Sequence, residues 1–431
     1  MDLKKTISET LTIKFDKAFG LDISDRSVEI VEMEKLFRFS VVTYGRIDLP
    51  NKIIQEGRII DPDALALKIK TLLKEVKPRK VSTNKVVISL PENQTFIKTF
   101  QIDSTLRGGQ LEKEILNKLS TSTPLGLDKM FWDYKIQELS DKTKKLVMFV
   151  GVPKEIALSY VKLCNSIGLE VVSISTEAFS LSRVILKKSE KQSLIIDLGA
   201  DVTNLIIFDS NEKINLAISL PFGGEDLTGK VSVELKLEWV EAEALKIKNG
   251  FKDKTEITSL MLTALQPLIK DIQTTIDYYE TNFKQKLDEI YITGGSSLLP
   301  NITDILKKNL NREVRLVTGG NNINLNFLAN QTKNFPLFTN VIGLGMLGAS
   351  AQFKDLNLLK QIPHAEINDV DRLNLFKLGY LSRVNTVRMI FNNKYVLITL
   401  IILIGVIFAI LIQQAQTFGL ASASSAIIGT Y

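Results

Sequence analysis

The chain of 431 residues is long enough for two or three domains, each with its own hydrophobic core. One cysteine (Cys164) and one histidine (His364) exclude a disulfide framework and a Cys/His zinc site. The net charge of +6 is distributed among nearly as many acids as bases along the chain. This distribution favours an ordinary solvated surface over nucleic acid as a partner.

The first half of the chain predicts an α/β unit into which a second unit is inserted. Residues 17–50 predict a strand, a turn and two further strands, and Asp61 and Pro62 are typical of the start of a helix over 61–74. A buried strand is predicted over 85–90. Residues 94–175 then predict their own α+β series, with strands at 95–102, 132–138, 146–152 and 170–174 and helices at 111–119 and 154–167.

The first pattern recurs in the second half. An apolar strand over 193–198 ends in Asp-Leu-Gly. Further strands are predicted at 204–209, 214–220 and 290–292, and helices at 241–248 and 257–283. A Gly-Gly-Ser-Ser loop follows at 294–297. Two copies of strand, acidic turn, strand and strand lie roughly 175 residues apart. Such a duplication predicts two lobes of like topology with a cleft between them.

The acidic turns of the two copies suit the recognition of a nucleotide. A triphosphate needs backbone N–H groups, a carboxylate near its metal ion, and small residues where the chain approaches closely. The turns that start at Asp22 and Asp197 each supply an acid at a strand end, and Gly199 can adopt backbone angles closed to other residues. Each turn alone is weak evidence, because an Asp-X-Gly turn is usually only a hairpin. Their order and spacing together predict a nucleotide cleft.

With these segments, the chain resembles the actin/Hsp70/sugar-kinase superfamily, with phosphate motifs at 19–32 and 195–208 and an adenosine motif at 291–301. It resembles the PilM family of type IV pilus assembly proteins most, and the FtsA family of cell-division proteins next. The PilM-like segments are 176–179, 222–228, 241–246 and 341–346.

The resemblance covers 17–352 and implies an α/β fold, a duplicated RNase H-like actin fold with two lobes around a nucleotide cleft. Lobe 1 is expected at 17–93 and 176–192, and lobe 2 at 193–352. Residues 94–175 are expected to form the small α+β subdomain that PilM and FtsA carry.

The resemblance also implies ATP and Mg²⁺ as cofactors, with a role for each matching residue. Asp22 and Asp197 would hold Mg²⁺, directly or through water. The phosphates would be lined by Ser24, Ser27, Gly199, Asp201 and Thr203. The adenosine would be surrounded by Gly224, Glu243, Lys246, Gly294, Gly295 and Ser296. Glu177 stands where relatives position the attacking water.

The first phosphate loop departs from the family pattern. It reads Asp-Ile-Ser instead of Asp-Ile-Gly, so that Ser24 replaces a glycine, and the bulky Arg26 stands where small residues are common. We expect ATP binding to survive, with weak or no hydrolysis. The sequence therefore leaves open whether the protein is an enzyme.

A membrane span is predicted near the C-terminal end. Residues 395–412 hold no charge and no proline, and 18 residues rise about 27 Å as a helix, roughly the thickness of the hydrocarbon core. Five basic residues and no acid lie between 372 and 394, so the body is expected in the cytoplasm, at the inner membrane, with a short exported tail at 413–431. The basic stretch is either an amphipathic helix on lipid or a partner, or an ordinary flank of the span.

The segment between body and span, 353–394, carries a peptide-like motif. Leu356, Asn357, Leu358 and Leu359 resemble the short Ile-Asn-Leu-Leu-Pro leader of PilN, the membrane partner of PilM, and 372–376 is similar. This resemblance implies a PilM-like body fused to a PilN-like leader and anchor, with the peptide docked either in cis or in a neighbouring copy.

The favoured function is a membrane-anchored ATP-binding scaffold of a type IV pilus-like system that links cytoplasmic and membrane components. Its expected partners are PilN/PilO-like proteins and further copies of the chain. An FtsA-like filament former for division is the first alternative. A small-molecule kinase is the second, although the sequence offers no catalytic acid beyond the two metal-type aspartates.

Overall fold

The computed structural model describes residues 17–121, 123, 125–138, 143–185, 191–209, 214–252, 255–320, 323–324, 329–350 and 356–362. The chain divides into two compact units, Met1–Ile362 and Pro363–Tyr431. The predicted span at 395–412, its basic flank and the exported tail lie outside the described residues. Among the residues that are described, no helix is long and apolar enough to cross a membrane.

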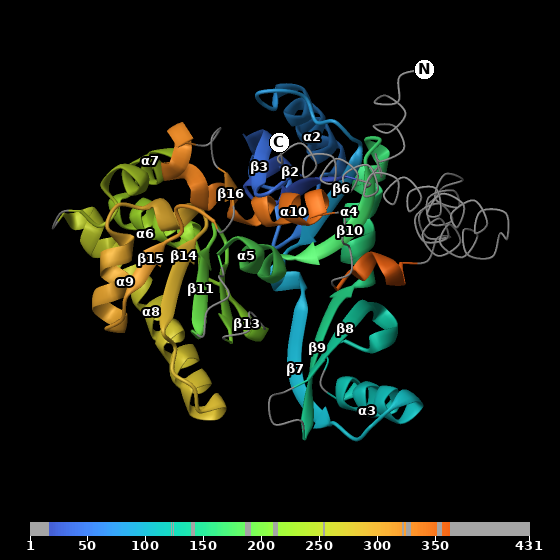
Figure 1. Cartoon of the computed structure of the whole chain (residues 1–431). Coiled ribbons are helices and arrows are strands. Elements are labelled where there is room, and N and C mark those ends of the chain that lie inside the picture. The colour runs from blue at the N-terminus through green and yellow to red at the C-terminus, as the bar shows by residue number, and fades with distance from the viewer. Residues whose placement is uncertain are drawn as a thin grey trace, which may run out of the picture. The chain divides into compact units, whose positions relative to one another are not determined.

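The first sheet has six strands in the order β10-β6-β1-β2-β3-β16 (Figure 1). Its strands are β1 (Phe19–Ile23), β2 (Ser27–Lys35), β3 (Phe39–Asp48), β6 (Lys85–Leu90), β10 (Glu170–Thr176) and β16 (Ile323–Asn324). β1, β2 and β3 are antiparallel neighbours, and β6 runs parallel to β1. The small ribbon of β4 (Ile54–Gln55) and β5 (Arg58–Ile59) follows β3 in sequence.

Four helices pack on this sheet, namely α2 (Pro62–Glu75), α4 (Lys154–Ser166), α5 (Glu177–Ile185) and α10 (Thr339–Ser350). The predicted start of α2 is confirmed, since the Asp61 carboxylate accepts a hydrogen bond from the Ala64 N–H (2.9 Å) and Pro62 occupies the first turn. α10 lies directly on β1 and β2. A Cβ added at Gly20 of β1 would lie 2.6 Å from the Gly345 nitrogen, so only glycine permits this contact.

The second sheet repeats the same connectivity. It has five strands in the order β13-β12-β11-β14-β15, and β14 runs parallel to β11 as β6 does to β1. Its strands are β11 (Ser193–Leu198), β12 (Thr203–Phe208), β13 (Ile214–Leu220), β14 (Glu289–Thr293) and β15 (Val314–Leu316). Its helices are α6 (Gly224–Leu235), α7 (Trp239–Asn249), α8 (Glu256–Phe283) and α9 (Ile302–Leu310). The apolar faces of these elements share one buried core.

A third, three-stranded sheet is inserted between β6 and β10. It is formed by β7 (Phe96–Asp103), β9 (Lys144–Pro153) and β8 (Met130–Glu138), and α3 (Gly108–Ser120) covers it (Figure 1). Ile115 and Leu119 of α3 pack on Val147 and Phe149 of β9. The hydroxyl of Thr99 in β7 donates to the Asn215 carbonyl in β13 (2.9 Å), which joins this subdomain to the second sheet. The described residues also form five 3₁₀ segments: η1 (Glu92–Gln94), η2 (Leu127–Lys129), η3 (Gly295–Leu298), η4 (Ala329–Phe338) and η5 (Leu358–Gln361).

Candidate functional site

A cavity of about 170 Å³ lies where the two large sheets meet. Nine of the residues expected at a nucleotide site line it, and they come from both copies of the repeated pattern: Asp22, Ser24, Ser27, Glu177, Asp197, Gly199, Asp201, Gly294 and Gly295. The duplicated strands β1 and β11 end at this cavity, so their acidic turns face the same space.

Asp22 lies close enough to Asp197 to affect the ionisation of Asp197. Burial, followed by the negative charge of Asp22, raises the pKa of Asp197 to about 7. Burial also raises the pKa of Asp22, and this rise is opposed by hydrogen bonds from Asn340 and Ser89. The Ser89 hydroxyl donates to Asp22 Oδ1 (3.2 Å) and accepts from the Asn340 amide (3.0 Å). Two buried acids of this kind are stabilised in their ionised form by a cation.

Unpartnered oxygens in the same cavity fit a hard metal ion. Among the described residues, Glu92 Oε1, Asn93 Oδ1 and Asn340 Oδ1 are buried without a hydrogen-bond partner, and all three residues line the cavity. Mg²⁺ prefers oxygen ligands and keeps several waters, which such oxygens can hold in place. No group of three or more His, Cys, Asp or Glu side chains is gathered tightly enough, in the part of the chain described, to hold a metal alone. The residues present therefore fit a metal held largely through water.

Arg26 crosses the cleft between the two acidic turns. Its guanidinium lies 3.6 Å from Asp201 Oδ1 and forms an ion pair with Glu225 at the start of α6, and it donates to Asn51 Oδ1 (2.6 Å). Burial and the charge of Glu225 raise the pKa of Asp201 to about 7, although Arg26 opposes this shift. The arginine thus links a turn of the first sheet to two acids of the second, at the position expected for the phosphates.

The hydroxyls of the first turn are oriented by one another and by a second cation. Ser24 Oγ donates to the Ser27 carbonyl (3.1 Å), and Arg46 donates to Ser27 Oγ (2.8 Å) and pairs with Glu29. Burial raises the pKa of Glu29 to about 8 even beside Arg46. Arg46 belongs to β3, and the sequence did not identify it as part of the site.

Glu177, expected to position water, begins α5 and lines the cavity. Its carboxylate accepts from the Asn204 amide of β12 (2.8 Å), and burial together with Asp197 raises its pKa well above the ordinary value. Glu92 lies next to it and accepts from the Ala178 N–H (3.3 Å), and burial raises the pKa of Glu92 to about 8. Glu92 was missed, although its place directly after the strand 85–90 was a usable signal.

The other expected adenosine and phosphate residues do not line the cavity, and their side chains bond within the second lobe. Lys246 Nζ donates to the Gly224 carbonyl (2.9 Å) and pairs with Glu243 (2.7 Å). Ser296 Oγ donates to the Gly199 carbonyl (2.9 Å), which joins this cluster to the second turn. The Thr203 hydroxyl donates to the Phe222 carbonyl (2.7 Å).

Gly294 lies in the cavity wall at a position that favours glycine both by its backbone angle and by the space around it. Its φ of +85° favours glycine, and an added Cβ would lie 2.5 Å from Asp197 Oδ1. This close approach lets the backbone of the loop after β14 reach the carboxylate at the end of β11.

The segment 356–362 packs against β8 and β10, beside which Figure 1 shows it. Asn357 Oδ1 accepts from the Ile174 N–H of β10 (3.0 Å) and from the Leu359 N–H (3.1 Å), and the Asn357 N–H donates to Asp133 Oδ2 of β8 (3.1 Å). Leu358 and Leu359 are buried. The peptide-like motif is therefore docked in its own chain in this structure.

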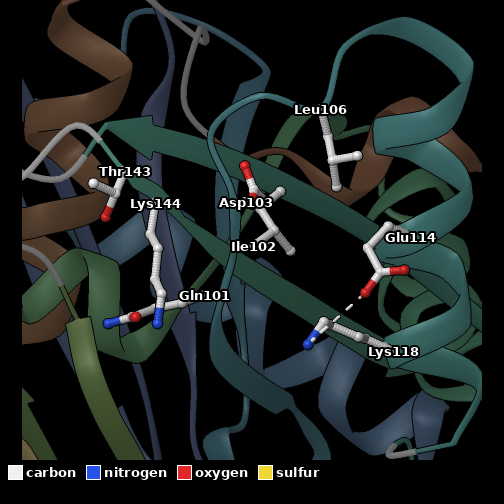
Figure 2. Close-up of a pocket in the computed structure, with 8 residues that line it drawn as sticks. All are labelled: Gln101, Ile102, Asp103, Leu106, Glu114, Lys118, Thr143 and Lys144. Carbon is white, nitrogen blue, oxygen red and sulfur yellow. Dashed lines mark ion pairs between the residues drawn. The ribbon is translucent and has the colours of Figure 1, made fainter.

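A larger cavity, of about 290 Å³, lies in the inserted subdomain (Figure 2). Its wall includes Asp103 and Lys144 and an ion pair between Glu114 and Lys118 (3.9 Å) along α3. None of the residues expected at the nucleotide site lines it. It is thus separate from the cleft between the two sheets.

Known proteins share this architecture. A family model described as type IV pilus assembly protein PilM matches residues 20–346. Two cell division proteins FtsA are similar in sequence. That of Enterococcus hirae is 22% identical over 374 residues (75% of this chain, 81% of the relative), and that of Enterococcus faecalis is 24% identical over 387 residues (78% and 84%).

A solved structure, the PilM-PilN type IV pilus biogenesis complex, contains a chain similar to this one in fold. The TM-score is 0.66 at 20% identity, over 77% of this chain and 98% of that chain. The expected actin-like α/β fold is thereby confirmed.

Proposed function

Because the chain belongs to the PilM family of type IV pilus assembly proteins, we propose that it is an ATP-binding scaffold of a pilus-type assembly system. The observation that carries the nucleotide part is that Asp22 and Asp197, from the two copies of one pattern, face a common cavity. Burial raises the pKa of both carboxyl groups, and a bound Mg²⁺ would favour their ionised forms.

In this proposal each wall of the cavity has its own role. Asp22 and Asp197 hold Mg²⁺ through water, and the unpartnered oxygens of Glu92 and Asn340 orient those waters. The backbone at Gly199 and the hydroxyls of the first turn face the phosphates. The bound ion offsets phosphate charge, and Glu177 is the residue placed to hold a water near the terminal phosphate.

Calorimetric titration of the full chain in lipid nanodiscs with Mg²⁺ and ATP tests the site. We expect binding by the unchanged protein and no measurable binding by Asp197→Ala. A suitable control is Asp209→Ala, because Asp209 follows β12 and is absent from the cavity wall. Equal affinities for the unchanged protein and Asp197→Ala would overturn the assignment.

We further propose that the segment around Asn357 is a PilN-like leader carried by the same chain. β8 and β10 bind Asn357 through a backbone N–H and a carboxylate, which is how many proteins recognise a short peptide. The predicted span at 395–412 follows this segment in the sequence. The chain would then be a single-pass protein of the inner membrane with its body in the cytoplasm, and it would link PilN/PilO-like membrane components to cytoplasmic ones.

Flotation of the purified full chain with vesicles, repeated after alkaline carbonate treatment, tests the anchor. Co-flotation that survives carbonate supports a spanning helix, and loss of the protein to the soluble fraction would overturn it. A change of Ile404 and Ile407 to Asp within the span should abolish flotation, because charges at the centre of a bilayer are costly.

The second candidate function is an FtsA-like, membrane-tethered filament former, which the similarity to two FtsA proteins favours. Electron microscopy of the full chain on anionic vesicles with Mg²⁺ and ATP separates the candidates. Regular polymers would favour the division-type function, and isolated particles would favour the scaffold.

A further inference from the structure

The hairpin of β2 and β3 ends in a tip that exposes two large apolar side chains. Leu36 is 85% exposed and Phe37 is 98% exposed. The turn itself is closed by a hydrogen bond from the Leu36 N–H to the Arg38 carbonyl (3.3 Å), and the Lys35 ammonium lies 5.0 Å from the centre of the Phe39 ring. The fold therefore presents both residues outward on an ordered turn, where neither contributes to a core.

Basic residues surround this tip. Lys35 and Arg38 flank it within the hairpin, and the exposed Arg79 lies beside it, because its guanidinium pairs with Glu34 (3.1 Å). Lys80, the next residue, is also exposed.

Among the described residues, the two acids of β2 closest in sequence to the tip are already engaged. Glu32 is buried and accepts hydrogen bonds from the Ser82 N–H and hydroxyl, and Glu34 is the partner of Arg79. β16, which pairs with Phe39 and Ser40, consists of Ile323 and Asn324 and adds no charge. The tip is thus apolar at its end and positive around its base.

We propose that the tip formed by Leu36 and Phe37 inserts into the headgroup region of an anionic membrane. Apolar residues above a basic collar are the combination that binds such interfaces, since lipid buries the apolar side chains while anionic headgroups attract the cations. The inference rests on the membrane anchoring proposed above. Residues 363–394 lie between the described body and the predicted span and, fully extended, would reach about 100 Å, so the tip can meet the bilayer.

A second exposed apolar residue shows why charge decides the choice of partner. Val240 on α7 is 80% exposed, but the acids Glu238 and Glu241 lie beside it in sequence and are exposed. Anionic lipid would repel that position. Val240 is therefore a control for position 36, with a similar exposed fraction (80% against 85% for Leu36) and acidic neighbours in place of basic ones.

The test uses the full chain in vesicles with an environment-sensitive fluorophore attached at Leu36→Cys or at Val240→Cys. The native Cys164 is buried, and burial raises the pKa of its thiol to about 12, so it should not react. In anionic vesicles we expect a blue-shifted emission and quenching by nitroxide lipids at position 36, and neither signal at position 240. Both signals should be lost when Phe37→Ser is added to Leu36→Cys.

The charge contribution is measured with Lys35→Glu and Arg38→Glu together. Each basic residue near an anionic surface favours binding by about fivefold, so the inserted fraction should fall at least tenfold. Vesicles of zwitterionic lipid alone should weaken the signal in the same direction. The thermal midpoints of the Leu36→Cys and Phe37→Ser variants should match that of the unchanged protein, because these two side chains are almost fully exposed.

The remaining outcomes separate the two proposals. Co-flotation of the full chain without a signal at position 36 would refute insertion and leave the anchor standing. A chain that does not float at all would refute the anchor and insertion together. Equal signals at positions 36 and 240 would show non-specific contact, and a blue shift without lipid that grows with protein concentration would show self-association. Either of these results would refute insertion.

Discussion

The docking of the segment 356–362 depends on one side chain, and its removal should release the segment. Asn357 is 6% exposed, and its Oδ1 accepts the N–H groups of Ile174 and Leu359. In Asn357→Ala both N–H groups lose their acceptor while buried. Each such loss costs about 1–3 kcal/mol, so docking should weaken by about 2–6 kcal/mol, at least roughly thirtyfold.

Hydrogen–deuterium exchange of the full chain measures this change. We expect the amides of 356–362 and of Ile174 to exchange faster in Asn357→Ala, while those of β1 stay as in the unchanged protein. Lys360→Ala is the control, because Lys360 is half exposed and lies 3.6 Å from Asp133 Oδ2. An exposed pair of this kind contributes about 0–1 kcal/mol, so exchange should change little.

Two results would refute this reasoning. Unchanged exchange of Ile174 in Asn357→Ala would mean that the side chain does not hold the segment. Equal acceleration in Lys360→Ala would mean that any change in the segment releases it. A synthetic peptide of residues 355–362 should in addition bind Asn357→Ala and not the unchanged protein, in which the chain's own segment already covers β8 and β10.

Three further predictions concern the cleft and the packing beneath it. In Arg26→Ala, Asp201 loses its cation, and the pKa of Asp201 should rise above about 7. The thermal midpoint should therefore fall more at pH 8, where Asp201 of the unchanged protein is ionised, than at pH 6. An equal fall at both pH values would contradict this reasoning. The raised pKa values of Asp197 and Glu92 (about 7 and 8) mean that the native state without metal keeps protons that the unfolded chain releases near pH 4. The free energy of unfolding measured with a denaturant should therefore fall as pH rises from about 5 to 8. Mg²⁺ should restore part of this free energy. A free energy of unfolding that rises over this range would refute the burial of these acids without a cation. Gly20→Ala would force a Cβ against the α10 backbone and should destabilise the protein by about 1–3 kcal/mol or more. Gly109→Ala is the control, because the space around Gly109 is open and this change should not destabilise the protein. Similar thermal midpoints for the two variants would contradict the packing of β1 on α10.

The repeated strands and their acidic turns were predictable because their signals are local. Strand alternation, the position of an acid at a strand end and the spacing from Asp22 to Asp197 can all be read along the chain. The resemblance of these motifs to a known superfamily then supplied the pairing of the two lobes. The structure accordingly brings both aspartates to one cavity.

Residues that reach the cavity from distant segments were not predictable. Asn340 enters from α10, and Arg46 enters from the last residues of β3. The sequence also could not tell which motif residues face the cavity. Thr203 and Lys246 belong to the expected motifs, yet their polar atoms are bonded to carbonyl groups of their own lobe.

Two helices that contain glycine, α6 and α10, were not predicted from the sequence. α6 begins at Gly224 and α10 contains Gly343, Gly345 and Gly348, so local propensity argues against both. In α10 the glycines allow contact with neighbouring backbone, and a Cβ added at Gly343 would lie 2.0 Å from the Ser180 carbonyl oxygen. Burial against β1 and α5 outweighs the propensity in this case.

The position of β10 at the rim of the first sheet has a practical consequence. An open strand edge is a template on which other chains aggregate. The segment 356–362 shields this edge, because Asn357 takes up the Ile174 N–H and Leu358 and Leu359 cover the apolar surface beside it. A fragment for biochemical work should therefore end after Ile362. A fragment that ends before Leu356 would expose the edge of β10 and the apolar surface beside it, and we expect it to aggregate.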